Sequence, residues 1–184
     1  MIRAANRPEL ESQFIPRDSC GVEVGVLRGQ HAAWLLNNLS LKKLYLVDHW
    51  LSYYRPGPPV PARIRDKQFR RVRDRFAKDS AIGRVVILRG DSKEMASRID
   101  DGSVDWVYVD ALHTYEGCLG DLEAYRPKIR AGGLLLAHDW WATETVNKAV
   151  ADYLEKYTQD ELIGVVEHGD GEAAIRIGGA ACSS

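Results

Sequence analysis

Acidic and imidazole side chains stand at the ends of several apolar runs of this chain, where a strand would give way to a loop. These residues are Asp48, Asp91, Asp110 with His113, and the adjacent pair His138 and Asp139. The carboxyl ends of parallel strands share one edge of an open sheet, so we expect these groups to line a common crevice. A buried carboxylate is costly unless it binds something, which favours a binding site over chance placement.

Oxygen and nitrogen ligands for a divalent cation are concentrated at two of these strand ends. The candidate ligands are Asp110 and Asp139 with up to two imidazoles, those of His113 and His138, because carboxylates suit Mg²⁺ or Mn²⁺ and imidazole shifts the preference toward Mn²⁺, Fe²⁺ or Zn²⁺. Without a metal, Asp110 or His113 could act as the general base that accepts a proton from a substrate hydroxyl. In the alternative interpretation, His113 and His138 only brace the loops that contain them.

A glycine turn follows the first apolar run and contains Glu23, Gly25 and Gly29. Glycine lets the backbone approach a ligand where a side chain would collide. Dinucleotide-binding enzymes use G-x-G-x-x-G, whereas this chain has no glycine two residues before Gly25. The spacing therefore argues against a bound pyrophosphate and suits a ligand with a ribose and no phosphate, such as S-adenosylmethionine. In the alternative, the segment is a tight strand-to-helix turn without a ligand.

Two further strand ends are placed to contact an adenosine. Asp48 ends the second run, the position from which an acid typically accepts hydrogen bonds from a ribose diol. Asp91 and Ser92 follow the third run, where Asp91 could contact the adenine amino group. Either side chain could instead cap the helix that follows, and the sequence favours neither role.

Apolar runs and helical patterns alternate five times before two extended segments close the chain around a glycine-containing turn. This alternation predicts an α/β fold, a three-layer α/β/α Rossmann-like sandwich with a mostly parallel seven-stranded sheet and a C-terminal β-hairpin. We expect a single domain over residues 1–184, with a lead-in at 1–19 that is helical or extended. The expected strands are 20–26, 43–48, 85–88, 104–110, 134–137, 162–167 and 173–177, and the expected helices are 30–38, 62–78, 92–99, 115–130 and 143–157.

Prolines interrupt the chain after the second strand. Four of the seven prolines fall within residues 50–62, which excludes a regular helix or a central strand there. The segment follows Asp48 and therefore lies on the ligand side of the sheet. Its aromatic residues Trp50, Tyr53 and Tyr54 could form a flap over the ligand or hold the segment down as a surface loop.

The composition is that of a soluble globular protein with balanced charge. The 25 Lys and Arg against 26 Asp and Glu leave a net charge of −1, which predicts no nucleic-acid partner and no membrane partner. Arginines between residues 63 and 75 alternate with acids and are interpreted as a solvated helix face. Three cysteines without a C-x-x-C pair, and no apolar run long enough to cross a bilayer, indicate a reducing, cytoplasmic setting.

Together these motifs resemble the class I S-adenosylmethionine-dependent methyltransferases, in particular the small bacterial O-methyltransferases near the macrolide-sugar and caffeoyl/catechol-type enzymes. The resemblance covers residues 20–177, and the order of the motifs and their places at strand ends are fairly specific. It rests on 23–25 through Gly29, Asp48, 90–92, 109–117, 132–133 and 137–140.

The resemblance implies a role for each motif. In that family the glycine turn holds the methionine part of the cofactor, the acid after the second strand binds the ribose, and the acid after the third contacts adenine. In the catechol-type branch the ligands of a divalent ion match Asp110, His138 and Asp139, with His-Asp here in place of Asp-Asn, and a lysine base lies near His113. Whether a metal is needed, and which one, stays open. The implied cofactor-binding set is Glu23, Gly25, Gly29, Asp48, Asp91, Ser92 and Asp110.

We therefore expect an S-adenosylmethionine-dependent enzyme that methylates a hydroxyl of a small molecule, with Asp110 and His113 as catalytic residues. The acceptor cannot be named from the sequence, and a homo-oligomer is an open alternative to a monomer. Two other functions compete with this one: a nicotinamide-dependent oxidoreductase, and a non-catalytic module that binds a nucleoside ligand on the same fold.

Overall fold

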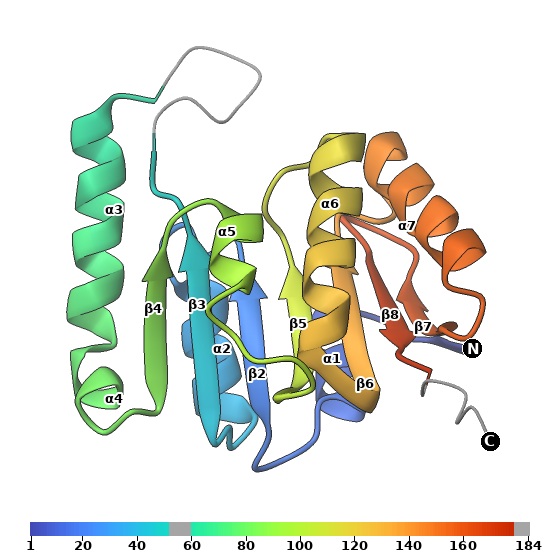
Figure 1. Cartoon of the computed structure of the whole chain (residues 1–184), viewed down its shortest axis with the longest axis horizontal. Helices are drawn as coiled ribbons and strands as arrows, with labels where there is room; N and C mark the ends of the chain where they lie inside the picture. The colour runs from blue at the N-terminus through green and yellow to red at the C-terminus, as the bar shows by residue number, and fades with distance from the viewer. Residues whose placement is uncertain (52–59, 179–184) are drawn as a thin grey trace.

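A computed structural model describes residues 1–51 and 60–178 and shows a single mixed sheet between layers of helices (Figure 1). The strands lie in the order β1-β7-β8-β6-β5-β2-β3-β4. Strand β8 runs antiparallel to both of its neighbours, and the other described pairs are parallel. The strands are β1 Ile2–Arg3, β2 Cys20–Val24, β3 Lys43–Asp48, β4 Val85–Arg89, β5 Val104–Val109, β6 Ile129–His138, β7 Glu161–Val166 and β8 Glu172–Arg176.

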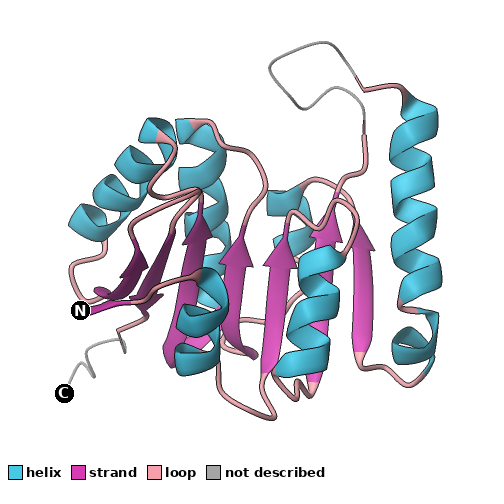
Figure 2. Cartoon of the chain, turned by 180° about the vertical axis from the view of Figure 1, so that it is seen from behind, coloured by secondary structure: helices cyan, strands magenta, loops and turns pink. Residues whose placement is uncertain are grey.

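Helices cover both faces of this sheet. Helices α1 and α2 lie on the face seen in Figure 2, α5, α6 and α7 lie on the opposite face, and α3 and α4 stand beyond the edge strand β4. In the described part of the chain, every helix is too short or too polar to serve as a transmembrane segment. The helices are α1 Arg7–Phe14, α2 Gln30–Asn38, α3 Ala62–Arg75, α4 Ala77–Ala81, α5 Ser92–Ala96, α6 Tyr115–Tyr125, the 3₁₀ turn η1 Arg126–Lys128 and α7 Glu144–Lys156.

The central strands are apolar on both faces because both faces are covered. In β5, Trp106 and Tyr108 pack into the cluster formed with α1 and α2, while Val107 and Val109 pack into the cluster formed with α5, α6 and α7. All four of these side chains are nearly or fully buried. A strand with this pattern cannot be exposed on either side, as expected for the middle of a parallel sheet.

The predicted fold class is confirmed, with differences in detail. The sheet has an eighth strand, because Ile2 and Arg3 of the lead-in pair with β7. The helix expected over 62–78 is divided at Phe76 into α3 and α4. Strand β6 begins before residue 134 and includes Gly133, where a Cβ atom would lie 2.5 Å from the carbonyl oxygen of Asp105. Glycine therefore lets this strand continue beside β5 instead of ending it.

Candidate functional site

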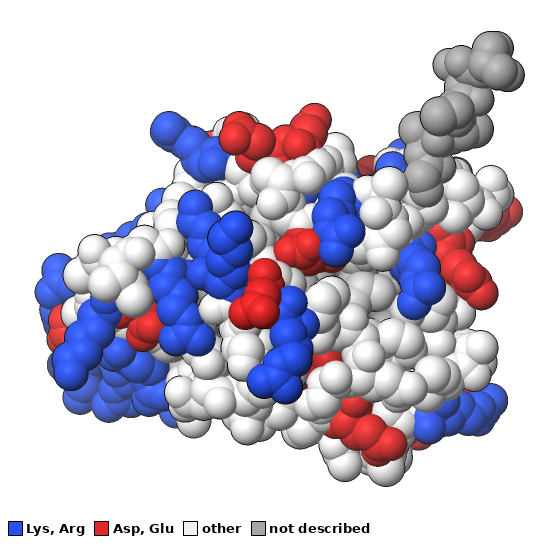
Figure 3. Space-filling view, turned by 90° about the horizontal axis from the view of Figure 1, so that it is seen from below, with Lys and Arg blue, Asp and Glu red and all other residues white. Residues whose placement is uncertain are grey.

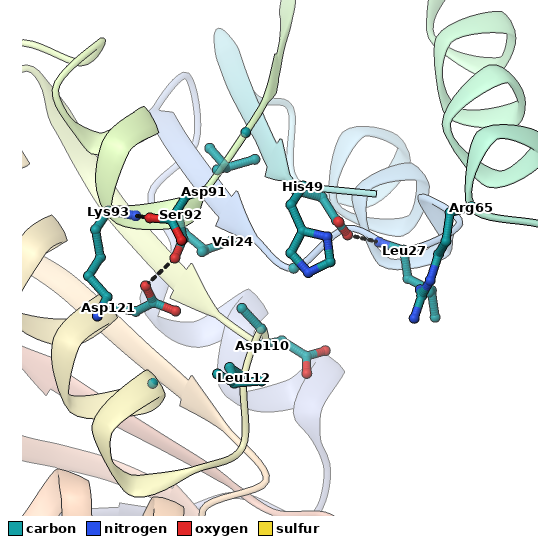
Figure 4. Close-up of a pocket in the computed structure, with 16 residues that line it drawn as sticks. Val24, Leu27, His49, Arg65, Asp91, Ser92, Lys93, Asp110, Leu112 and Asp121 are labelled. Carbon is teal, nitrogen blue, oxygen red and sulfur yellow. Dashed lines mark hydrogen bonds between the residues drawn. The ribbon is translucent and has the colours of Figure 1, made fainter. Parts of the chain in front are cut away.

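A cavity opens at the carboxyl ends of β2, β3, β4 and β5, on both sides of the point where the chain order of the strands reverses (Figure 4). Open parallel sheets bind their ligands at such a switch point. Of the residues predicted to contact a cofactor, those that line the cavity are Gly25, Asp48, Asp91, Ser92 and Asp110. The other two, Glu23 and Gly29, do not line it.

The side chain of Asp48 joins the glycine turn to the segment after β3. One carboxylate oxygen accepts a hydrogen bond from the backbone N–H of Leu27 and the other from that of Trp50, each at 2.8 Å. The indole of Trp50 donates to the carbonyl of Leu27 at 3.0 Å and packs against Phe69. A carboxylate oxygen has further lone pairs, so Asp48 can still accept from a ligand at the cavity wall.

Trp50 belongs to the core and not to a flap, because its side chain is 1% exposed. The rest of the proline-rich segment, including Tyr53 and Tyr54, lies outside the described residues. The alternative between a flap and a surface loop therefore stays a prediction for those two tyrosines.

The two glycines of the turn have different roles. Gly25 has a φ of 97°, and a Cβ atom there would lie 1.9 Å from the carbonyl oxygen of Asp110, so no side chain fits. Gly29 has a φ of 68° and begins α2, and the space beside it is filled by the ring of Phe76. Packing between α2 and the α3–α4 junction therefore accounts for Gly29, and its predicted contact with a cofactor stays a prediction.

Glu23 lies beneath the turn in a buried network with His31. The imidazole of His31 contacts Glu11 of α1 at 2.8 Å and Glu23 of β2 at 3.5 Å; both carboxylates are buried, and the His31 side chain is 9% exposed. Burial lowers the pKa of His31, but hydrogen bonds that the imidazole donates to both carboxylates outweigh burial and raise it to about 9. Burial raises the pKa of Glu23. This network fixes α1 and α2 against the sheet directly under the site.

Asp91 and Ser92 form the wall of the cavity nearest α5 and α6. Asp91 accepts hydrogen bonds from the backbone of Lys93 and Glu94 and so caps α5, although it also lines the cavity. The capping role is therefore confirmed, and contact with adenine stays a prediction. Ser92 donates a hydrogen bond of 2.5 Å to Asp121 of α6.

Asp121 is a cavity residue that the sequence did not suggest. It is 1% exposed, and burial raises its pKa to about 6 against the opposing hydrogen bond from Ser92. The available signal was helical spacing, because Asp121 lies one turn after Gly117 and both line the cavity. A second unsuspected wall residue is Arg65 of α3, which lies across the cavity from Asp121 (Figure 4).

The acids and histidines at the ends of β5 and β6 converge as predicted. The His113 Nε2 lies 2.9 Å from a carboxylate oxygen of Asp139 and 3.3 Å from one of Asp110. The His138 Nδ1 lies 3.5 Å from oxygens of the same two aspartates. Asp139 adopts a φ of 59°, an uncommon conformation that aspartate tolerates better than most residues. We call these four residues the strand-end cluster.

Mutual pairing shifts the protonation of the strand-end cluster. Hydrogen bonds that His113 donates to Asp110 and Asp139 raise its pKa to about 9. Burial lowers the pKa of His138, but the same two carboxylates raise it to about 10. Burial opposes ionisation of Asp110 and Asp139, yet both histidines hold the pKa of each carboxyl below its usual value. Without a metal, the cluster is a set of ion pairs at neutral pH.

The donor set of this cluster fits a divalent cation. Ligand atoms of Asp110, His113 and Asp139 lie within 4.8 Å of one another, and so do those of His138, Asp139 and Asp170. The predicted set of Asp110, His138 and Asp139 is thus divided between two overlapping groups that share Asp139. His138 Nδ1 is buried and makes no hydrogen bond with the described residues, which suits a nitrogen that ligates. Asp170, in the hairpin turn, was not predicted.

Residues 22–140 match the model of a methyltransferase-domain family. The chain belongs to this family of class I S-adenosylmethionine-dependent methyltransferases. The resemblance seen in the sequence is therefore confirmed, and a nicotinamide-dependent oxidoreductase is no longer a competing interpretation. No curated protein matches the chain at a significant level.

Solved structures of similar fold come from several methyltransferases. A rRNA methylase from Streptococcus thermophilus is 13% identical, with a TM-score of 0.67 over 97% of this chain and 99% of that chain. A proposed caffeoyl-CoA O-methyltransferase from Staphylococcus aureus is 15% identical, with a TM-score of 0.65 over 96% and 86%. A proposed methyltransferase from Streptococcus mutans, solved in complex with SAH, is 12% identical, with a TM-score of 0.65 over 96% and 99%. At these identities the likeness shows the fold.

Proposed function

We propose that this protein transfers the methyl group of S-adenosylmethionine to a hydroxyl group of a small molecule. The proposal rests mainly on Asp110, which belongs both to the cavity and to the strand-end cluster. Asp110 lines the cavity, and its carboxylate lies 3.3 Å from the imidazole of His113 and 3.5 Å from that of His138. A cofactor in the cavity would therefore present its reactive end beside groups able to hold and deprotonate an acceptor.

The cavity wall supplies a partner for each part of the cofactor. Asp48 would accept hydrogen bonds from the ribose hydroxyls, and the Ser92–Asp121 side would hold adenine. The methionine part would pass Gly25, where the absence of a side chain leaves the backbone accessible. The SAH complex of the Streptococcus mutans protein, which shares the fold, supports this choice of ligand.

S-adenosylmethionine would supply a sulfonium-bound methyl carbon for in-line attack by an acceptor oxygen, with the methyl carbon–sulfur bond breaking and S-adenosylhomocysteine leaving. The strand-end cluster would orient that oxygen, and one of its groups would take the proton. Because His113 has a pKa of about 9, it carries a proton at neutral pH and would donate a hydrogen bond to the acceptor unless a metal or higher pH deprotonates it. A cation held by Asp110, Asp139 and the histidines would lower the pKa of the acceptor hydroxyl.

Three measurements test this proposal. Isothermal titration should show that S-adenosylhomocysteine binds and that NAD does not, and a panel of hydroxylated small molecules should yield a methylated product. Melting temperature in Mn²⁺ or Mg²⁺ should rise for the wild type and not for Asp139→Asn, because both overlapping ligand groups contain Asp139. Binding of NAD alone would overturn the proposal, and equal shifts in both proteins would remove the metal from it.

RNA is a second candidate acceptor, favoured by the surface of α3. Lys and Arg side chains gather at the end of the molecule where α3 and α4 lie (Figure 3), and a groove there is lined by Lys67, Arg70, Arg71, Asp74 and Arg75. Within the described residues, no acid lies at ion-pair distance from Arg70 or Arg71. The rRNA methylase of the same fold acts on such a polymer.

Salt dependence separates the two acceptors. If RNA is the substrate, a labelled rRNA fragment should bind with an affinity that falls steeply as salt rises, and Arg70→Gln/Arg71→Gln should weaken it without changing binding of S-adenosylhomocysteine. Absence of salt-sensitive binding would leave the small-molecule acceptor as the proposal, and the arginines as the solvated face that the sequence predicts.

A further inference from the structure

One cavity residue has a charge that no side chain of the described residues neutralises. Arg65 of α3 is 7% exposed, and its Nε is buried with no hydrogen-bond partner among those residues. Its guanidinium donates one bond, of 3.3 Å, to Gln68 of the same helix. Among the residues that the structure describes, no carboxylate lies within ion-pair distance of it.

Arg65 differs from Arg126, an arginine of the same protein whose guanidinium is paired with a carboxylate. Arg126, which is also partly buried, makes a two-bond contact with Asp160 at 2.8 Å and 2.9 Å. A guanidinium group has five N–H donors in a rigid planar fork and needs an anionic partner when it is buried. An uncompensated buried charge is destabilising, and a charge at a cavity wall is compensated when an anionic ligand binds there.

The position of Arg65 limits which part of a ligand it can reach. In Figure 4 the residue lies beside Leu27, at the end of the cavity opposite Asp121 and Lys93. Leu27 follows Gly25 in the glycine turn, and its N–H donates to Asp48. A ligand with adenine near Ser92 and Asp121 and ribose near Asp48 would place its amino-acid end at this turn.

We propose that Arg65 binds the carboxylate of the methionine moiety and so selects the complete adenosyl amino acid over shorter adenosine thioethers. The inference rests on the proposed function, because it takes S-adenosylmethionine as the ligand. S-adenosylmethionine has one carboxylate and no phosphate, so its only anionic group matches the guanidinium of Arg65, which has no carboxylate partner in residues 1–51 and 60–178. Two parallel N–H···O bonds from a planar guanidinium fit a carboxylate well.

The test compares two ligands that differ in the amino-acid end. S-adenosylhomocysteine has the carboxylate, whereas 5′-methylthioadenosine has the adenosine and the thioether without it. Isothermal titration of Arg65→Gln should show a loss of about tenfold or more in affinity for S-adenosylhomocysteine and no change for 5′-methylthioadenosine, since a hydrogen-bonded charge pair is removed from one complex only. Arg65→Lys should lie between, because it keeps the charge and loses the two-bond geometry.

Controls separate binding from folding. Arg63→Gln removes the same charge from an exposed site of α3 that does not line the cavity, and should leave both affinities unchanged. Arg65→Met keeps the packing of the apolar stem and replaces Arg65→Gln if that variant does not fold.

The outcomes distinguish this inference from the function on which it rests. If the wild type fails to bind S-adenosylhomocysteine, the proposed function is overturned. If the wild type binds it, and the Arg65 variants lose affinity for both ligands equally or for neither, the role of Arg65 is overturned while the function stands.

Discussion

Removal of the His31 imidazole should destabilise the protein in a way that depends on pH. In the folded chain this imidazole lies between Glu11 and Glu23, at 2.8 Å and 3.5 Å, and its side chain is 9% exposed. His31→Gln keeps a polar side chain and removes the positive charge. Glu23 is then buried without a cation, and Glu11 keeps only its longer contact of 3.9 Å with Arg7, which is the costly state for an ion pair in an interior.

The size of the effect follows from the shift in the pKa of His31. Its pKa rises from 6.5 to about 9 on folding, which corresponds to about 3 kcal/mol at roughly 1.4 kcal/mol per pKa unit. Breaking a buried pair costs about 3–5 kcal/mol. Burial raises the pKa of Glu23, so Glu23 can take up a proton once His31 is gone. We therefore expect the lower end of that range, about 3 kcal/mol.

The sign of the pH dependence follows from a folded-state pKa that is higher than the unfolded one. The contribution of His31 is fully present below about pH 6.5 and is lost as pH rises through about 9. The difference in unfolding free energy between the wild type and His31→Gln should therefore be largest near pH 6 and small at about pH 10.

Urea unfolding at a series of pH values measures this difference. His168→Gln is the matched control, because His168 lies in the exposed hairpin turn, and it should match the wild type throughout. A difference below about 0.5 kcal/mol near pH 6, or one that does not change with pH, would refute the assignment of His31 as the cation of this network.

Two further predictions concern the cavity. Gly25→Ala should lower the unfolding free energy by about 2 kcal/mol or more, because the new Cβ atom would collide with the backbone of Asp110. Gly169 is the control: it also has a positive φ but faces open space, so Gly169→Ala should lower the unfolding free energy by only about 1 kcal/mol in the same urea titration. Asp48→Asn should weaken binding of S-adenosylhomocysteine in a calorimeter and cost about 1–2 kcal/mol of stability, since an amide cannot accept at both of its ends the bonds from Leu27 and Trp50. Unchanged affinity would mean that Asp48 holds the turn only.

The polar residues at the carboxyl ends of the strands could be predicted from the sequence, because each strand and its end are marked by a short local pattern. An apolar run followed by an acid identifies a strand and its end, and parallel topology then places Asp48, Asp91 and Asp110 on one edge. The same reasoning predicted that His113 would meet Asp110 and Asp139. No such local pattern marks β1, whose two residues form a strand only because β7 offers an unpaired edge.

The roles of single residues within those elements were decided by tertiary packing. Sequence determined that Gly29 lies at a strand-to-helix turn, but only the ring of Phe76, far along the chain, shows that packing requires it. Asp121 and Arg65 reach the cavity from helices whose orientation no local pattern specifies. A residue's own neighbours in sequence set its backbone conformation, whereas its contacts depend on segments brought beside it by folding, and these carry the chemistry of the site.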